Sequence, residues 1–445
     1  MAMYLMPSRS IPLDDSWDVV VVGGGSSGCA AAIAAAEEGA RTLLVEAGSA
    51  LGGMSTSGLV PVWVTYSDGE KIIYRGLAEK VFSACKAGMP HVDPRQPEWV
   101  PIDAERLKRI YDGFVTGAGA TVSFNTLLAA VETGEDGAVR ALILANKAGL
   151  NACRARVYVD CTGDADLAAW AGAPFEKGDA NGDLQPATLC MMLSNVDTYG
   201  YEHCGRILDY GQADPVIRKM LASGKYPAVC DFHFDNSLVG PGTVTLNAGH
   251  MWKADNTDPG SSSRALIQGR QNAAQFRDAL AEFFPRAFGN ALLAATAAQL
   301  GARETRRIVG DYVLTIEDYK ARRSFPDEIC RSAYTVDVQN ASPAAEDIRA
   351  AQQDYDAMAY RPGESYGVPY RCLTPRGVRN VLVAGRCIST DRLVNGSTRM
   401  IPVCLATGEA AGTAAAMAAR GDADVHGVAV DLLRTRLRQR GVYLP

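Results

Sequence analysis

The stretch that decides the fold runs DVVVVGGGSSGCAAAIAAAEEGARTLLVE, from Asp18 to Glu46. It begins with the apolar, β-branched run Asp18–Val22, which is typical of a strand buried on both faces of a parallel sheet. Cys29–Glu38 then predicts a helix, and Arg41–Val45 predicts a second apolar strand. A strand, a glycine-rich turn, a helix and a strand in this order predict a βαβ unit of a Rossmann-like α/β domain.

The turn between the first strand and the helix has the spacing G-x-G-x-x-G, with Gly23, Gly25 and Gly28 in the fixed places. The first glycine allows a tight turn, the second lets a pyrophosphate approach the backbone, and the third lets helix and strand pack closely. The N-terminus of the helix, with Ser26 and Ser27, offers free N–H groups to phosphates. The motif therefore predicts a dinucleotide site, and the alternative is a glycine-rich turn without a ligand.

Glu46 ends the second strand, 18 residues after Gly28, close to the spacing of a ribose-binding acid. Its carboxylate is expected to accept hydrogen bonds from ribose hydroxyls, and its charge would repel the 2′-phosphate of NADP. The small-residue stretch Ala47–Gly58 (AGSALGGMSTSG) follows directly. It resembles flavoproteins of the glutathione-reductase and fumarate-reductase type, in which this part of the chain runs along the flavin. A flexible surface loop is the alternative. The resemblance implies FAD contacts at the following residues: Ala47, Gly52, Gly53 and Met54.

Three predicted strands, Thr126–Val131, Ala138–Leu144 and Arg154–Val159, lead into Asp160–Asp164 (DCTGD). This end resembles the A-T-G element that closes the FAD site in the same families, although Cys161 replaces the usual small residue. An ordinary turn after a strand is the alternative. The resemblance implies FAD contacts at Thr162, Gly163 and Asp164.

A third segment, Asn380–Gly412, combines a predicted strand at Val381–Ala384 with a predicted helix at Pro402–Ala419. In the resembling families this helix directs the positive end of its dipole at the flavin pyrimidine, where it would stabilise negative charge. The resemblance therefore implies flavin contacts at four residues between the strand and the helix: Gly385, Arg386, Arg399 and Met400.

With these three segments in chain order, the sequence resembles the FAD-dependent oxidoreductase family related to fumarate reductase and succinate dehydrogenase flavoproteins. Leu300–Tyr312 and Tyr366–Leu373 support the resemblance. It implies a glutathione-reductase-type FAD domain with an inserted α+β substrate domain. The related enzymes carry a histidine for covalent FAD just after the first glycine-rich loop. Gly53–Thr56 has none, so the FAD is expected to be non-covalent.

The expected organisation is an FAD domain at residues 14–170 and 371–445, with a substrate or cap domain at 171–370. Within the insert, Leu189–Leu193 and Thr243–Asn247 predict strands, and Ser263–Phe284 and Ala287–Leu300 predict helices. The chain has no second strand–G-x-G-x-x-G–helix unit, so no NAD(P)H domain is expected. Electrons would leave to O2 or to a separate carrier.

The composition limits the partners. The net charge of −6 argues against a nucleic-acid-binding surface, and no apolar run reaches the ~20 residues of a membrane span. The 11 cysteines show no C-x-x-C pair, which disfavours a zinc site or a redox disulfide and favours a reducing, cytoplasmic location. No metal site is expected, and the sequence predicts no oligomeric state.

The catalytic residues are sought among those that would face the flavin ring. His250, in TVTLNAGHMW (Thr243–Trp252), is the first choice for a general base and His233 the second, because histidine titrates near neutral pH. The alternative for each is a hydrogen-bonded structural histidine. Arg399 would hold a substrate carboxylate or the flavin C2=O, unless it forms a packing salt bridge.

Tyrosine and arginine residues give further, less specific choices. Tyr370, beside Tyr366, would donate a proton or stack on the substrate, and core packing is the alternative. Arg303, Arg306 and Arg307 are expected at one helix end with Glu304, either as an internal ion-pair network or as an anionic-substrate site. These three arginines complete the set of candidate site residues.

The expected function is an FAD-dependent oxidoreductase, a dehydrogenase or desaturase that passes a hydride from a small organic substrate to flavin N5. A fumarate-reductase-like C=C reductase is one alternative. A non-redox flavoprotein, such as a hydratase or isomerase, is the other.

Overall fold

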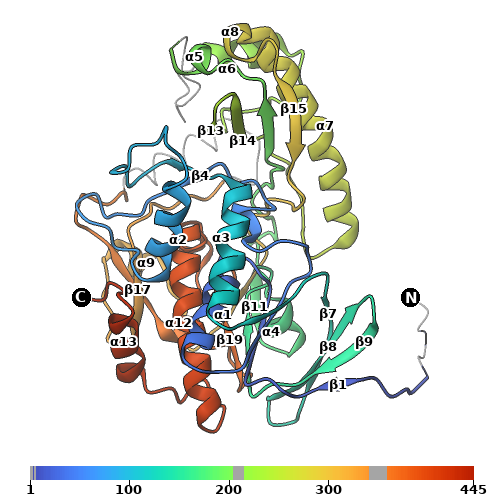
Figure 1. The fold of residues 1–445 in the computed structure, drawn as a ribbon, viewed down its shortest axis with the longest axis vertical. Coiled ribbons are helices and arrows are strands. Elements are labelled where there is room, and N and C mark those ends of the chain that lie inside the picture. Colours follow the sequence, from blue (N-terminus) through green and yellow to red (C-terminus); the bar gives the residue numbers. More distant parts are fainter. Residues whose placement is uncertain (1–3, 5–6, 204–214, 340–357) are drawn as a thin grey trace.

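A five-stranded parallel sheet forms the centre of the lower lobe in Figure 1, in the order β19–β10–β2–β3–β6. The computed structural model describes residues 4, 7–203, 215–339 and 358–445. The strands of this sheet are Val19–Val22 (β2), Thr42–Val45 (β3), Thr121–Ser123 (β6), Val157–Asp160 (β10) and Val381–Val383 (β19). Strand β19, from the last part of the chain, thus lies beside β10, from the first part. The sheet is therefore Rossmann-like, and two separate segments of the sequence build it.

The two faces of the sheet pack against different partners, because successive side chains of a strand point to opposite sides. Val19 and Val21 lie in the core formed with helices α1 (Ser26–Glu37) and α12 (Ile401–Arg420). Val20 and Val22 lie in a second core formed with Leu142 of strand β8. The parallel sheet is therefore covered on both faces, which explains its continuous apolar strands.

Helices α1 and α12 cross in close contact, because glycines remove the side chains between their backbones. A Cβ atom at Gly408 would lie 2.1 Å from the carbonyl oxygen of Ser27, and one at Gly412 would lie 2.1 Å from that of Ala31. The alanines of both helices fill the rest of the contact. This packing fixes the N-terminus of α12 beside the glycine-rich loop.

The sheet on the far face has the order β1–β9–β8–β7. Its strands are Leu13–Asp14 (β1), Leu127–Thr133 (β7), Val139–Asn146 (β8) and Gly149–Cys153 (β9). The sequence predicted three strands in this region, including β10, but missed β9. That strand has a half-exposed, weakly alternating pattern, and it forms because a two-residue turn after Asn146 returns the chain antiparallel to β8.

The upper lobe in Figure 1 is built on an antiparallel sheet in the order β13–β14–β12–β15, with α7 packed against it. Its core is separate from that of the lower lobe and spans residues 191–291. The elements of this lobe are Met191–Ser194 (β12), Thr198–His203 (α5), Pro215–Ser223 (α6), Phe234–Gly240 (β13), Thr243–Ala248 (β14), Pro259–Phe283 (α7), Pro285–Phe288 (α8) and Leu292–Thr296 (β15).

The helix predicted at Ala287–Leu300 is wrong. The short helix α8 ends at Phe288, and β15 follows and pairs with β12. Gly289 and Asn290 break the helical pattern, and sheet pairing decides the conformation of the alanine-rich residues after them.

Part of the predicted insert packs with the lower lobe. Leu314, Ile329 and Tyr366 lie in the same core as α1 and α12. The domain boundaries at 170 and 370 therefore stay a prediction. The hydrophobic core formed by residues of the insert alone covers the shorter span 191–291. The remaining elements are Val62–Trp63 (β4), Val100–Pro101 (β5), Phe175–Lys177 (β11), Arg306–Ile308 (β16), Glu328–Ser332 (β17), Tyr366–Pro369 (β18), Gly53–Ser55 (η1), Leu77–Lys86 (α2), Ala104–Gly117 (α3), Asp166–Trp170 (α4), Ile316–Lys320 (α9), Tyr370–Cys372 (η2), Arg392–Thr398 (α11) and Val430–Gln439 (α13).

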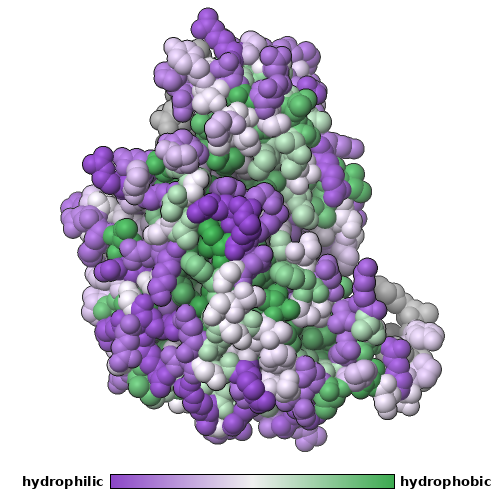
Figure 2. All heavy atoms as spheres, in the orientation of Figure 1, coloured by the Kyte–Doolittle hydropathy of each residue, from purple (hydrophilic) through white to green (hydrophobic). Residues whose placement is uncertain are grey.

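Among the described residues, α12 is the one helix long and apolar enough to cross a membrane by length and composition. Within it, 83% of the most apolar window is buried inside the protein, as expected for a core helix. On the face shown in Figure 2, hydrophobic residues are scattered among hydrophilic ones.

Candidate active site

The glycine-rich loop turns at the carboxyl end of β2. Gly23 has a φ of +96°, and a Cβ there would lie 2.4 Å from the carbonyl oxygen of Cys161. A Cβ at Gly28 would lie 1.8 Å from the carbonyl oxygen of Gly23. A Cβ at Gly25 would meet nothing within 4 Å. The first and third glycines are therefore required by packing, whereas the second faces open space, as a backbone that receives a pyrophosphate must.

Helix α1 begins directly after this loop, with Gly25 as its N-cap and no side-chain capping hydrogen bond from that residue. The first N–H groups of the helix, including those of Ser26 and Ser27, thus keep their positive partial charge at the loop. The side chains of these two serines point into the protein. Ser26 bonds to the carbonyl of Gly52 at 3.3 Å, so its hydroxyl serves packing rather than the loop's open side.

Glu46 follows β3 and lies beside the loop, almost fully buried. Its Oε2 accepts a hydrogen bond from the N–H of Gly24 at 2.6 Å, and its Oε1 accepts one from the N–H of Gly48 at 2.6 Å. Each carboxylate oxygen has a second lone pair that can still accept a ribose hydroxyl. Glu46 therefore both shapes the loop and stays available for the ribose, while Ala47 next to it is exposed.

The other segments expected at the cofactor close around the same loop. Gly52 donates its N–H to the carbonyl of Gly24 at 2.8 Å, and a Cβ at Gly53 would lie 2.9 Å from the Cα of Gly25. The turn Thr162–Asp164 comes next to Arg386, whose Nη2 donates to Asp164 Oδ1 at 2.6 Å. The structure thus brings these predicted cofactor residues, distant in sequence, to one place.

A cavity of about 890 Å³, its open mouth included, lies between the two lobes. One wall comes from the lower lobe and is largely apolar. Met54 follows the glycine-rich segment, and Met400 and Ile401 form the start of α12. The N-terminus of α12 is therefore at the cavity, as the sequence predicted. This apolar wall consists of Met54, Val60, Pro61, Val62, Val64, Trp99, Met400 and Ile401.

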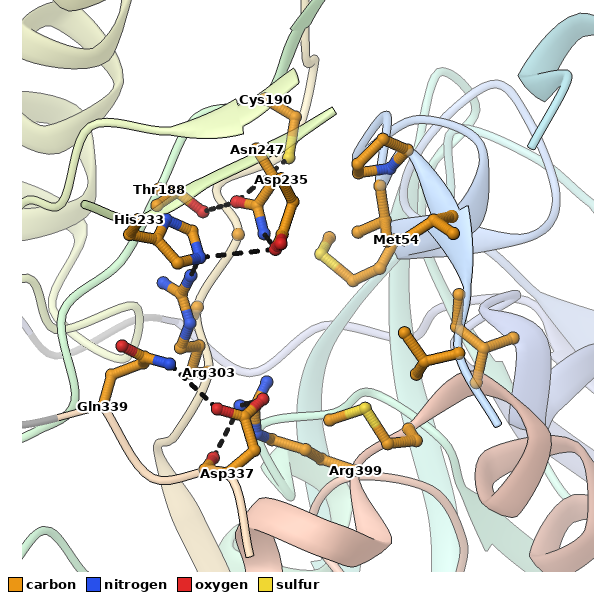
Figure 3. Close-up of a pocket in the computed structure, with 18 of the residues that line it drawn as sticks. Met54, Thr188, Cys190, His233, Asp235, Asn247, Arg303, Asp337, Gln339 and Arg399 are labelled. Atoms are coloured by element: carbon orange, nitrogen blue, oxygen red, sulfur yellow. Dashed lines mark hydrogen bonds and ion pairs between the residues drawn. The ribbon is translucent and has the colours of Figure 1, made fainter. Parts of the chain in front are cut away.

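The opposite wall is polar and comes mainly from the upper lobe (Figure 3). Asp235 of β13 and Asn247 of β14 lie directly opposite each other in the sheet register, so they share one face. Asn247 Nδ2 donates to Asp235 Oδ2 at 3.2 Å, and Thr188 Oγ1 donates to Asn247 Oδ1 at 2.7 Å. Cys190 lies beside them, and burial raises the pKa of its thiol to about 12, so it is not a nucleophile at neutral pH.

His233 lies two residues before Asp235 on the same face, and its ring lines the cavity. Its Nε2 is 3.0 Å from Nη2 of Arg303 and 3.5 Å from Oδ2 of Asp235. A guanidinium can only donate, so Nε2 accepts this bond and the proton of the neutral ring is on Nδ1. Arg303 is held by a second bond, from Nη1 to the carbonyl of Pro186 at 2.7 Å.

His250, the first choice for a catalytic base, does not line the cavity; this choice is corrected. Its ring stacks behind His233, with centroids 4.3 Å apart, and its Nδ1 bonds to Asp231 Oδ2 at 2.6 Å. Burial, followed by the nearby His233, lowers the pKa of His250 to about 3, so the ring is neutral at neutral pH. Its Nδ1–H donates to the Asp231 carboxylate and thus fixes the ring against His233.

Tyr370 is also placed away from the cavity, contrary to the prediction. It is almost fully buried in the lower core, and its hydroxyl donates to the carbonyl of Val425 at 2.7 Å. Its neighbour Tyr366 bonds to Ser397 Oγ at 2.7 Å within the same core. Both tyrosines pack and satisfy the backbone and side-chain groups around the return of the chain to the lower lobe.

The four predicted arginines divide into two groups. Arg303 and Arg399 line the cavity. Arg306 and Arg307 do not, and they lie on strand β16 rather than at a helix end. Arg307 pairs with the buried Glu304, and Arg306 donates to Asp166 at 2.7 Å, so these two form the internal ion-pair network.

Arg399 lines the lower part of the cavity, where its Nη2 donates to Asp337 Oδ2 at 2.9 Å and to the Asp337 carbonyl at 2.8 Å. Gln339 Nε2 donates to the other oxygen of Asp337 at 2.8 Å. The salt bridge expected as the alternative thus exists, and it places the guanidinium on the cavity wall (Figure 3).

A family model described as FAD dependent oxidoreductase matches residues 18–437. The chain belongs to this family. The protein is therefore a flavin-dependent redox enzyme that uses FAD. The glycine-rich loop, the buried acid after β3 and the Gly385–Arg386 turn stay the predicted FAD contacts. The comparison with curated proteins gives no match.

Solved structures match most of this chain at low sequence identity. A geranylgeranyl bacteriochlorophyll reductase-like protein from Thermoplasma acidophilum is 16% identical, covers 97% of this chain and 84% of its own, and has a TM-score of 0.48. The anhydrotetracycline hydroxylase OxyS from Streptomyces rimosus is also 16% identical, with 95% and 65% covered and a TM-score of 0.46.

The residues of the loop fit FAD. The open space over Gly25, the uncapped N-terminus of α1 and the buried carboxylate of Glu46 form a cradle for a pyrophosphate and its adenosine ribose. At the other end, Met54, Arg386 and Met400 lie on the cavity wall, where the sequence placed flavin contacts. The cradle and the cavity are thus the places where the two ends of FAD are expected.

Sequence reasoning missed much of the polar wall. Asp235, Asn247 and Asp337 were not singled out, and Trp99 at the mouth of the cavity was also missed. The spacing His-x-Asp was the available signal, because on a strand it would place both side chains on one face. No strand was predicted there. No sequence signal shows that residues 188, 233, 247 and 303 share the polar wall of the cavity. They come together only when the strands β13, β14, β12 and β15 pair into one antiparallel sheet.

Proposed function

We propose that this enzyme is an FAD-dependent dehydrogenase of a small organic molecule, with His233 as the group that takes the substrate proton. The observation that carries the proposal is the position of His233. Among the described residues it is the histidine on the cavity wall, with Nε2 in its acceptor form between Arg303 and Asp235. An imidazole in that state can remove a proton from a hydroxyl or amine.

The neighbours of His233 suit this role in both protonation states. In the neutral ring, Nε2 accepts from Arg303 at 3.0 Å. Once Nε2 is protonated it can no longer accept, and it turns toward Asp235, whose Oδ2 is 3.5 Å away. Arg303, held by its bond to the carbonyl of Pro186, lies beside the ring, where its positive charge stabilises the oxygen that gives up its proton. The bound flavin supplies the acceptor for the hydride.

His250 and Asp231 act as positioning residues in this proposal. The stacked ring of His250 and its 2.6 Å bond to Asp231 hold His233 from behind. Burial raises the pKa of Asp231, but the hydrogen bond from His250, the electrostatic interactions with His250 and His233, and the backbone N–H of His233 together outweigh it, so this pKa is lowered below its usual value. The pair is therefore an ionised carboxylate and a neutral imidazole.

One experiment distinguishes the proposed dehydrogenase from two alternative functions. Arg399 on the cavity wall supports a C=C reductase of the fumarate-reductase type, since a guanidinium can hold a substrate carboxylate. A relation of this chain to fumarate reductase and succinate dehydrogenase flavoproteins is proposed only as part of this alternative. A non-redox flavoprotein would bind its ligand without any change in the oxidation state of the flavin.

The proposal extends to the location of the enzyme and to its electron acceptor. The cysteines in the described part of the chain are all free thiols, which supports a reducing, cytoplasmic location. O2 or a separate carrier is proposed as the electron acceptor, because the sequence offers one dinucleotide motif only.

Anaerobic rapid mixing with a substrate tests the proposal through the flavin absorbance near ~450 nm. His233→Ala should slow flavin reduction by ~10²–10⁴-fold, the usual contribution of a general base, with its flavin content unchanged. His233→Asn is the second variant, because it keeps a polar side chain in the wall if the alanine variant is unstable. A wild-type rate of reduction in either variant would remove His233 from the mechanism.

A further inference from the structure

The polar wall carries information about the substrate class, which deepens the proposed function and rests on it. Arg303, Arg399, Asp235 and Asp337 give this wall two guanidinium groups and two carboxylates, so its formal charges cancel. Arg386, also on the cavity, is paired with Asp164 at 2.6 Å. A dicarboxylate would meet two aspartates here. Among the described residues, the lining and the Asp164 that pairs with Arg386 have no net positive charge to compensate it.

The charged groups of the wall are also bonded to one another. Asp337 accepts from both Arg399 and Gln339, at 2.9 and 2.8 Å, and Asp235 accepts from Asn247 at 3.2 Å. The wall therefore presents donors and acceptors in alternation rather than an isolated cation or anion. A hydroxyl group both donates and accepts, so a row of hydroxyls matches such a wall. An apolar alkene would form no hydrogen bond with this wall.

Trp99 at the mouth of the cavity gives a second, independent observation. Its side chain is 51% exposed although it is a large aromatic residue. Its backbone has a φ of +52°, a conformation that bulky residues rarely adopt, and the side chain of Gln96 holds it by donating to the carbonyls of Glu98 and Trp99. Strain of this kind is retained at functional sites. An exposed indole on the apolar wall, opposite the polar one, suits the C–H face of a hydroxylated ring.

We infer that the substrate is a polyhydroxylated carbon compound of the sugar or cyclitol class, oxidised at a secondary alcohol. The hydroxyl proton goes to His233, and the hydride of the same carbon, with both electrons, goes to the oxidised flavin. The C–H and O–H bonds break as the C=O bond forms. The polar wall holds the neighbouring hydroxyls, and Trp99 covers the ring at the mouth.

Calorimetric titration of the oxidised holoenzyme with a panel of neutral monosaccharides, uronates and cyclitols tests this inference by binding alone. Succinate, fumarate and D-alanine complete the panel, each up to about 10 mM, ten times the upper end of ordinary KM values. At least one polyol is expected to bind, and the dicarboxylates and the amino acid are not. Binding of a dicarboxylate or of D-alanine without any polyol, or no binding at all, overturns the inference.

Trp99→Gly sharpens the test. Glycine accepts a φ of +52° without strain, so the melting temperature should not fall, whereas the Kd of the bound polyol should rise tenfold or more. Trp170→Ala is the matched control, because Trp170 is similarly exposed, at 45%, and does not line the cavity. An unchanged Kd in Trp99→Gly contradicts the inference. A polyol that binds but never bleaches the flavin keeps the substrate class and overturns the proposed dehydrogenase.

Discussion

Glu46 shows how one side chain serves the loop and the cofactor together. Both of its oxygens accept backbone N–H groups at 2.6 Å in the protein itself, and each keeps a lone pair that can accept a ribose hydroxyl. Removing this carboxylate removes two bonds that shape the glycine-rich loop and the charge-assisted bonds to the ribose, each worth ~1.5–3 kcal/mol.

Glu46→Ala should therefore weaken FAD binding by at least about tenfold, measured by titrating the apoprotein with FAD. Glu132→Ala, an exposed glutamate on β7, is the matched control and should leave the FAD affinity unchanged. An FAD titration of Glu46→Ala that matches the wild type would remove Glu46 from the FAD site.

The cofactor should leave the protein without covalent attachment, since Gly53–Thr56 has no histidine. Acid precipitation should release the yellow colour into the supernatant, where its spectrum and mass identify FAD. Colour that stays in the pellet would show a covalent link.

At the scale of elements, the contact of α1 with α12 decides where the flavin end of the site lies. The two helices cross so closely that a Cβ at Gly412 would lie 2.1 Å from the carbonyl oxygen of Ala31. Neither backbone can move aside, because α1 packs on the parallel sheet and α12 on β17 and α2. The glycines of α12 thus set the position of its N-terminus at the cavity.

Gly412→Ala should lower the free energy of unfolding by about 3 kcal/mol, the upper part of the range for overpacking, in a urea titration. Gly113→Ala is the matched control, since Gly113 also lies inside a helix and a Cβ there meets nothing within 4 Å. That variant should gain about 0.5–1 kcal/mol, as alanine favours a helix over glycine. Equal stabilities of the two variants would contradict the packing argument.

The same scale shows what the sequence could and could not predict. The elements of the FAD fold were predictable, because the apolar run of β2, the glycine spacing and the acid after β3 are local signals. The strand β15 was not, because its alanine-rich residues read as helical until they pair with β12. The choice of His250 over His233 failed for a related reason, since only the sheet register decides which histidine faces the cavity.

At the scale of the whole molecule, Asp164 joins the two lobes. Its Oδ1 accepts from Thr305 at 2.7 Å and from Arg386 at 2.6 Å, and its Oδ2 accepts from Asn256 at 2.6 Å. Asn256 lies in the loop before α7 of the upper lobe, so one carboxylate connects the cofactor side to the substrate side.

Asp164→Ala should destabilise both the apoprotein and the holoprotein by about 3 kcal/mol, because it leaves the largely buried Arg386 without its counter-ion. Urea unfolding of both forms separates this effect from lost FAD binding. Asp136→Ala, which breaks the exposed pair with Arg140, should cost about 1 kcal/mol or less. A loss confined to the holoprotein would show that Asp164 serves the cofactor alone.

The pH dependence of stability depends in part on His426. Burial lowers the pKa of His426, but the hydrogen bonds to Asp311 and to the carbonyl of Val378 outweigh it, so the folded pKa is raised. The stabilisation from its protonated form is therefore fully present below the unfolded pKa of ~6.5 and is lost as the pH rises through the raised folded pKa. His426→Gln and Asp311→Asn should each flatten the melting temperature between acidic and mildly alkaline pH; a profile as steep as that of the wild type in both would contradict this linkage.

The central claim is that the cavity between the lobes is a redox site in which His233 takes the proton of an oxidised substrate. Anaerobic mixing of the holoenzyme with a compound that it binds, followed by the flavin absorbance near ~450 nm, tests this claim most directly. The account predicts that the absorbance bleaches in the wild type and bleaches ~10²–10⁴-fold more slowly in His233→Ala at equal flavin content. A bound compound that shifts the flavin spectrum without bleaching it, or a His233→Ala variant that bleaches at the wild-type rate, would contradict it.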